Sequence, residues 1–228
     1  MNEDERAPIC WIVGAGEYDP ELHVATSASD LVIAADRGLE NARQMGLSPS
    51  LLVGDFDSLG WIPDGENVVR LPVEKDVTDT AAAVAEGIKR GYTRFLLLGC
   101  TGGRPDHTYA AYQLLADLAA GGNFGVLIGD GFTVTALSDG SLCFPPEEKG
   151  TLSVFAVGGP AAGVDLSGVF YPLTDGTLDP TFPLGVSNSF VGKPVSVTVR
   201  RGTLLIFAEG AWLPGESDVG RRTMIPTD

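Results

Sequence analysis

The chain has 228 residues and a formal net charge of −15 at pH 7, with 44% hydrophobic and 20% charged residues. This length suits one large or two small domains, and the composition is that of an ordinary globular protein. The acidic excess argues against nucleic acid or an anionic membrane as a partner, because both bind basic surfaces.

Cysteine usage and hydropathy suggest where the protein works. We expect no membrane span, since no segment is long and apolar enough. The polar and acidic residues 1–8 resemble neither a signal peptide nor a transit peptide. Cys10 and Cys100 lie in or at the end of apolar runs, which indicates reduced, buried thiols. We therefore expect a cytoplasmic protein.

Short apolar runs alternate with helical patterns through the first part of the chain. The predicted helices cover residues 38–45, 80–90 and 108–120, and glycine follows each of them. The predicted strands cover residues 10–13, 31–35, 51–53, 68–71, 95–98, 125–128 and 132–137. Such an alternation predicts an N-terminal Rossmann-like parallel sheet with helices on both faces.

The pattern changes near residues 138–150, beyond which no helix is predicted. Short strands are expected at residues 151–157, 168–171, 187–191, 195–200 and 203–207. Residues 195–199 alternate apolar and polar side chains, as a half-buried antiparallel strand does. We therefore expect an α/β domain at residues 1–138, a C-terminal antiparallel β-sandwich at 139–212 and a polar tail at 213–228.

The segment Gly54-Asp-Phe-Asp-Ser58 places two carboxylates directly after a predicted strand. In an extended segment, Asp55 and Asp57 would point to the same side and repel each other unless a cation lies between them. Carboxylates together with substrate phosphates suit Mg²⁺. The alternatives are a solvated acidic turn or an N-cap of a following helix.

Other acidic residues also follow predicted strands. Because ligands of open parallel sheets bind outside the carboxyl ends of the strands, we expect these carboxylates to converge on one crevice. The residues are Asp36, Asp76, Asp79 and Asp106.

Each polar residue near this crevice also has a structural interpretation. Asp79 and Thr78 could each cap a helix as readily as bind the ligand, and the two roles are compatible. Arg104 could form an ordinary ion pair. Arg104 follows two glycines, however, so a phosphate could approach it closely. His107 is more typical of a structural helix start than of a general base. Residues 14–16 read as a tight turn near the ligand and not as a dinucleotide fingerprint.

Taken together, these motifs resemble the thiamine pyrophosphokinase family over roughly residues 9–208. The motifs are Ala35-Asp-Arg-Gly38, Gly54-Asp-Phe-Asp-Ser58, Lys75-Asp-Val-Thr-Asp79 and Gly102-Gly-Arg-Pro-Asp-His107, with Tyr171-Pro-Leu173 and Leu184-Gly-Val-Ser-Asn-Ser-Phe190 in the β-rich part. The resemblance implies transfer of a pyrophosphoryl group from ATP to the hydroxyl of thiamine, which yields AMP and thiamine diphosphate.

The resemblance also implies roles for individual residues. The expected Mg²⁺ ligands are Asp55, Asp57 and Asp79, and the expected catalytic set adds Arg104 and Asp106. The expected ATP- and phosphate-binding residues are Asp36, Arg37, Lys75, Asp76, Thr78, Arg104 and His107. The family is a homodimer with thiamine bound where two subunits meet, and the expected thiamine contacts are Tyr171, Ser187 and Asn188.

The first motif departs from the family pattern, which is often Ala-Asp-Gly-Gly-Ala-Asn. Arg37 replaces a glycine, and Glu40 stands where the asparagine would be. Arg37 either adds a phosphate contact or merely tolerates the turn. Two other functions stay open: a non-catalytic binder of thiamine or a nucleotide, and a Mg²⁺-dependent phosphotransferase or phosphohydrolase acting on another substrate.

Overall fold

The computed structural model describes residues 7–57, 65, 67–72, 74 and 76–210. The chain divides into two compact units: Met1–Leu114 with Asn123–Asp130, and Leu115–Gly122 with Gly131–Asp228. Among the described residues, no helix combines the length and the apolar character needed to cross a bilayer. The expected division at residue 138 into two domains stays a prediction.

The first unit is built on a parallel sheet. Its strands are β1 (Cys10–Val13), β2 (Leu31–Ala35), β3 (Leu51–Gly54), β4 (Val68–Arg70), β5 (Arg94–Leu98) and β6 (Phe124–Ile128). They pair in the order β4-β3-β2-β1-β5-β6, and every neighbouring pair is parallel. Ile12, Ile33 and Val53 are fully buried, which is typical of strands covered on both faces. The predicted parallel sheet is confirmed.

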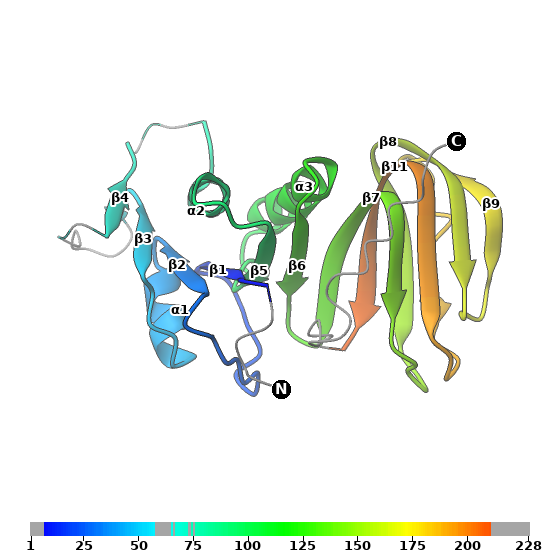
Figure 1. Cartoon of the computed structure of the whole chain (residues 1–228), viewed down its shortest axis with the longest axis horizontal. Helices are drawn as coiled ribbons and strands as arrows, with labels where there is room; N and C mark the ends of the chain where they lie inside the picture. The colour runs from blue at the N-terminus through cyan, green and yellow to red at the C-terminus, as the bar shows by residue number, and fades with distance from the viewer. Residues whose placement is uncertain (1–6, 58–64, 66, 73, 75, 211–228) are drawn as a thin grey trace. The chain divides into compact units, whose positions relative to one another are not determined.

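Helices α1 (Gly38–Gln44) and α2 (Asp79–Lys89) lie on opposite faces of this sheet (Figure 1). Gly46 and Gly91, directly beyond their caps, adopt left-handed φ values of 71° and 86°, as the sequence predicts for helix ends. Helix α3 (Pro105–Ala120) begins three residues earlier than expected. Proline has no backbone N–H, and it suits the first position of a helix because an N–H there would have no intrahelical acceptor.

The strand order reverses between β1 and β5, because the chain runs from β1 to β4 on one side and continues through β5 and β6 on the other. In doubly wound folds such a switch point opens a crevice at the carboxyl ends of the two strands. The loops after β1, β2 and β5 therefore frame the candidate site.

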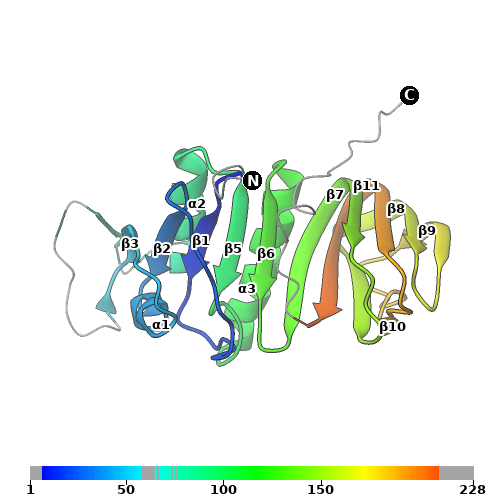
Figure 2. The same ribbon diagram turned by 60° about the horizontal axis from the view of Figure 1, so that its bottom comes forward.

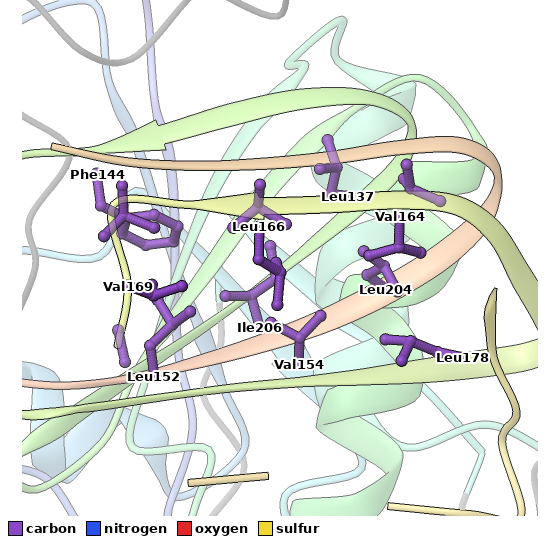
Figure 3. Packing of buried hydrophobic residues seen from close by; sticks show 14 of the residues in the cluster. Leu137, Phe144, Leu152, Val154, Val164, Leu166, Val169, Leu178, Leu204 and Ile206 are labelled. Carbon is purple, nitrogen blue, oxygen red and sulfur yellow. The ribbon is translucent and has the colours of Figure 1, made fainter. Parts of the chain in front are cut away.

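The second unit is an antiparallel sheet in which β7, β8 and β11 are long and β9 and β10 are short. It contains β7 (Phe132–Phe144), β8 (Thr151–Ser167), β9 (Leu173–Leu178), β10 (Asn188–Ser189) and β11 (Val195–Glu209). Strand β11 pairs with β7 and β8, and β8 also pairs with β9 and β10 (Figure 2). Apolar side chains from β7, β8, β9 and β11 share one core (Figure 3). The expected fold class, parallel α/β followed by antiparallel β, is confirmed.

Several predicted strand limits in this unit are wrong. The strand expected to end at Leu137 instead continues as β7 to Phe144. Within it, Asp139 has φ 46° and its Oδ1 accepts from Gly202 N at 2.9 Å. The registers of β11 with β7 and with β8 also shift near residues 199–203. Relative to β7, the extra residues lie in β11, at 200–202 opposite Asp139, and such a bulge increases the local twist of the strand pair.

Two predicted strands are shorter than expected. Only an isolated bridge between Val169 and Phe190 remains of the strand expected at residues 168–171. The strand expected at 187–191 reduces to β10. The chain here turns repeatedly, and side chains replace part of the backbone ladder.

Candidate active site

The loops that follow β1 and β5 are hydrogen-bonded to each other along their backbones. Gly14 N donates to Leu98 O at 2.8 Å, Gly16 N to Gly99 O at 2.6 Å, and Glu17 N to Thr101 O at 2.7 Å. A Cβ on Gly16 would lie 2.2 Å from Thr101 O, so only glycine permits this approach. Ala15 and Gly16 line one wall of the pocket described below, and a tight turn near a ligand at residues 14–16 stays a prediction.

Asn41 holds this wall against helix α1. Its Nδ2 donates to Gly14 O at 2.8 Å and to Gly16 O at 2.9 Å. The sequence-based reasoning missed Asn41, although an asparagine on the inner side of a short predicted helix was a usable signal. Two carbonyls of the loop are thereby satisfied without a strand partner.

Three carboxylates meet beyond the ends of β2 and β3. Asp36, Asp55 and Asp57 each offer an oxygen, and these atoms lie within 4.8 Å of one another. Small side-chain rotations would bring such a set around one cation at the ligand distance of about 2.1 Å that Mg²⁺ prefers. The donor set, all oxygen and all anionic, fits Mg²⁺ rather than a softer metal.

The convergence has a different cause from the one expected. Strand β3 ends at Gly54, and Phe56 between the two aspartates has φ 61°, so Asp55 and Asp57 are not on one side of an extended segment. Instead, a left-handed turn redirects the chain, and Asp57 N donates to Asp55 Oδ1 at 3.2 Å. The Phe56 side chain is only 2% exposed and anchors this turn in the core.

Asp36 also lies in the left-handed region, with φ 49°. Its backbone N donates to Val53 O at 2.9 Å, which ties the end of β2 to β3. A Cβ on Gly54 would lie 3.2 Å from Asp36 Cα, so the two strand ends are in direct backbone contact. This contact brings Asp36 to the pair on the next strand.

The structure places Asp79 differently from the acidic trio. Thr78 caps helix α2, with its Oγ1 accepting from Ala81 N at 3.1 Å, and Asp79 is the first helical residue. The capping role of Thr78 is confirmed. Asp79 is not among the three clustered carboxylates, and Asp76 is exposed. Lys75 lies outside the described residues.

A pocket of about 350 Å³ lies beside Asp36. Its walls come from the loops after β1, β2 and β5 and from the starts of α2 and α3. The lining residues used below are Asp36, Arg37, Thr78, Gly102, Arg104 and His107. These positions lie at the carboxyl ends of the strands, where open parallel sheets bind their ligands. Of the aspartates that were expected to converge there, Asp36 is the one that lines this pocket among the described residues.

Each arginine at this pocket forms an ion pair with a nearby carboxylate. Arg104 Nη2 lies 2.5 Å from Asp106 Oδ2 and its Nε donates to Oδ1 at 3.2 Å. This hydrogen bonding lowers the pKa of Asp106 and raises that of Arg104. Arg37 lies 3.1 Å from Glu40 on α1. Because these pairs are exposed, they are weak enough to be exchanged for an anionic ligand.

Two buried thiols complete the first unit. Cys10 and Cys100 are free and buried, as expected, and burial raises the pKa of each thiol to about 12. Cys100 lines the pocket, but a thiol with this pKa is protonated at neutral pH and is a poor nucleophile. The Cys100 thiol is therefore not a candidate nucleophile at neutral pH.

The three residues expected to contact thiamine lie in the second unit, and their side chains differ in exposure and hydrogen bonding. Tyr171 is exposed. Ser187 has φ 59°, and its N donates to Ser153 Oγ at 3.0 Å. Asn188 is buried, and its side chain is hydrogen-bonded to the backbone of Tyr171.

Comparison with protein families then gives two matches along the chain. Residues 22–123 match the thiamin pyrophosphokinase catalytic domain, and residues 141–204 match the vitamin B1 binding domain of the same enzyme. The chain belongs to the thiamin pyrophosphokinase family. The first match contains the acidic trio and the pocket arginines, and the second contains Tyr171 and Asn188, so the family assignment covers both candidate regions.

Solved thiamin pyrophosphokinases share this fold. The crystal structure of the Bacillus subtilis enzyme aligns with a TM-score of 0.75 at 21% identity, covering 90% of this chain and all of that one. The Geobacillus thermodenitrificans enzyme gives 0.73 at 24% identity, covering 89% and 97%. The Candida albicans enzyme gives 0.67 at 13% identity, covering 89% and 88%. A comparison with curated protein sequences gave no match.

Proposed function

We propose that this chain transfers the β,γ-pyrophosphoryl group of ATP to the hydroxyl of thiamine, giving thiamine diphosphate and AMP. The observation that carries the proposal is the cluster of Asp36, Asp55 and Asp57 next to a pocket with glycine-rich walls and an arginine on its rim. Phosphoryl-group transfer depends mainly on positioning and charge neutralisation. An acidic cluster beside an anion-binding pocket meets both needs.

Within this proposal, Asp55 and Asp57 hold Mg²⁺, and Asp36 is the ligand that the geometry adds. Asp79, expected as a ligand from the family resemblance, stays a proposed one. When bound, Mg²⁺ would neutralise charge on the phosphates as the phosphorus–oxygen bond breaks. One of the Asp55 and Asp57 carboxylates accepts the proton of the attacking hydroxyl.

The pocket rim would receive the phosphates. Arg104 and Arg37 would exchange their carboxylate partners for phosphate oxygens, which a guanidinium binds with two parallel N–H groups. Asp106 keeps the Arg104 guanidinium oriented before the ligand arrives. A Cβ on Gly103 would meet nothing within 4 Å, which leaves space for close approach, whereas the space beside Gly102 is filled by the Glu17 side chain. The proposed phosphate-binding set also includes Thr78, Asp76, Lys75 and His107.

We place thiamine binding in the second unit and propose a homodimer in which the second unit of one subunit completes the site of the other. Support comes from apolar side chains that are exposed there, namely Phe170, Tyr171, Phe182, Leu184 and Val186. Exposed apolar side chains gathered in one region are typical of contact surfaces.

The buried, free cysteines support a cytoplasmic location.

Product analysis by phosphorus NMR tests the proposed reaction. Purified protein with Mg²⁺, ATP and thiamine should yield AMP and thiamine diphosphate in equal amounts. ADP with a monophosphate ester would indicate a different phosphotransferase, and free phosphate formed without thiamine would indicate a phosphohydrolase. Binding of both substrates without turnover would support the non-catalytic alternative.

A further inference from the structure

Asn188 lies at the centre of a hydrogen-bonded clamp in the second unit. Its Oδ1 accepts from Tyr171 N at 2.9 Å and from Ser189 N at 2.9 Å, and its Nδ2 donates to Tyr171 O at 2.7 Å. Phe170 N adds a bond to Ser189 O at 3.0 Å. The two residues of β10 therefore fix the backbone of residues 170–171, which belong to no strand.

The clamp supports two aromatic rings at the surface. Phe170 and Tyr171 are 62% and 65% exposed, and their rings form an edge-to-face pair with centroids 4.8 Å apart. Large aromatic side chains this exposed have little reason to be held rigidly unless they receive a ligand or a partner. The backbone that carries these rings is hydrogen-bonded to the buried side-chain amide of Asn188.

We propose that Asn188 is a positioning residue, which acts on thiamine through the Phe170–Tyr171 aromatic pair and does not contact thiamine itself. This inference rests on the proposed function. Asn188 is only 5% exposed, and its side chain already makes three of the four hydrogen bonds that an amide can make. An amide used in this way has little capacity left for a substrate.

The chemistry of the aromatic pair suits thiamine. Thiamine carries a permanently charged thiazolium ring and a flat aminopyrimidine ring. Aromatic faces attract cations and stack on flat heterocycles. Asparagine suits the clamp because its amide accepts from Tyr171 N through one atom and donates to Tyr171 O through another. Aspartate would keep the acceptor and lose the donor.

Thiamine binding by titration calorimetry, together with steady-state kinetics, tests this role. We expect Asn188→Ala to weaken thiamine binding about tenfold, the effect of losing roughly one to two hydrogen bonds. KM for thiamine should rise while KM for ATP stays within twofold of wild type. Thr177→Ala, an exposed substitution on β9, serves as the control and should leave both constants unchanged. Asn188→Asp, which preserves the side-chain shape, should also weaken thiamine binding and replaces the alanine variant if that one does not fold.

A double-mutant cycle separates positioning from direct contact. In a Phe170→Ala/Tyr171→Ala background, Asn188→Ala should weaken binding by less than about twofold, because the rings it positions are already gone. Additive losses would show that Asn188 contacts thiamine directly and would overturn the inference while leaving the proposed function intact. If the wild-type protein failed to bind thiamine, both would be overturned. Hydrogen exchange at the Tyr171 amide gives a reading independent of thiamine: it should be slow in wild type and fast in Asn188→Ala, which removes the acceptor for this amide. Fast exchange in wild type would overturn the clamp alone.

Discussion

At the scale of single residues, two left-handed backbone positions create the acidic cluster. Asp36 and Phe56 have φ values of 49° and 61°. Aspartate tolerates this region because its short side chain bonds locally, whereas a bulky residue such as phenylalanine rarely adopts it. Burial of the Phe56 ring, worth about 2 kcal/mol or more, offsets the strain. Strain of this kind often marks a functional site.

The geometry makes a prediction that separates Asp36 from Asp79. Asp36→Asn should raise the Mg²⁺ concentration needed for half-maximal turnover by more than Asp79→Asn does. The reason is that, of these two residues, Asp36 is the one that belongs to the clustered carboxylates. Metal titrations of both variants at saturating ATP and thiamine measure the difference. A larger shift in the Asp79 variant would restore the ligand set expected from family resemblance.

The buried thiols predict how stability changes at high pH. Burial raises the pKa of Cys10 and Cys100 from 9.0 to about 12 in the folded protein. The stabilisation is therefore fully present below pH 9 and is lost as the pH rises from 9 to 12, by up to about 1.4 kcal/mol per pH unit for each thiol.

Urea unfolding at pH 8, 9.5 and 10.5 measures this loss. A Cys10→Ala/Cys100→Ala variant is the control, and its stability should fall less steeply with pH than that of wild type. If stability fell equally steeply with pH in both proteins, the thiols would not contribute to the pH dependence of stability.

At the scale of elements, glycines allow the loops of the first unit to pack closely. A Cβ on Gly38, the first residue of α1, would lie 1.9 Å from Val13 O at the end of β1. We expect Gly38→Ala to destabilise the protein by about 3 kcal/mol, since either the helix or the strand must move.

Gly159 is the matched control because a Cβ there meets nothing within 4 Å. Gly159→Ala should change stability by less than about 0.5 kcal/mol. Thermal and urea unfolding of the two variants give the comparison. Similar small effects from both would show that α1 shifts away from β1 without cost.

Local sequence patterns predicted most elements because strand runs and helix stops are local signals. Gly46 and Gly91 marked helix ends, and Thr78 marked a cap. The continuation of β7 past Leu137 was missed, because Asp139-Gly140 looks locally like a turn and its pairing partners lie near residue 200. The aspartates after the strands were predicted to converge as one group, and the described residues bring Asp36, Asp55 and Asp57 together. The choice of Asp36 over Asp79 depends on backbone angles that no local pattern reveals.

At the scale of the whole molecule, two features act in opposite directions on self-association: the net charge of −15 and the exposed apolar residues of the second unit. Like charges keep molecules apart, whereas the apolar surface favours association. We expect a dimer in sedimentation experiments, and Phe182→Asp should shift it toward monomer because it adds a charge to an exposed apolar position. A monomeric wild-type protein with full activity would contradict the shared site.

The central claim is that the carboxylates beyond β2 and β3 carry the chemistry, and one paired measurement tests it most directly. Turnover and melting temperature are compared for Asp57→Asn and for Asp117→Asn, which removes the same charge from an exposed position on α3. Asp57→Asn should lower kcat at least about a hundredfold with a melting temperature within about 2 °C of wild type, and Asp117→Asn should change neither. An Asp57→Asn enzyme with near-normal kcat, or one whose activity falls only as its stability does, would contradict the account.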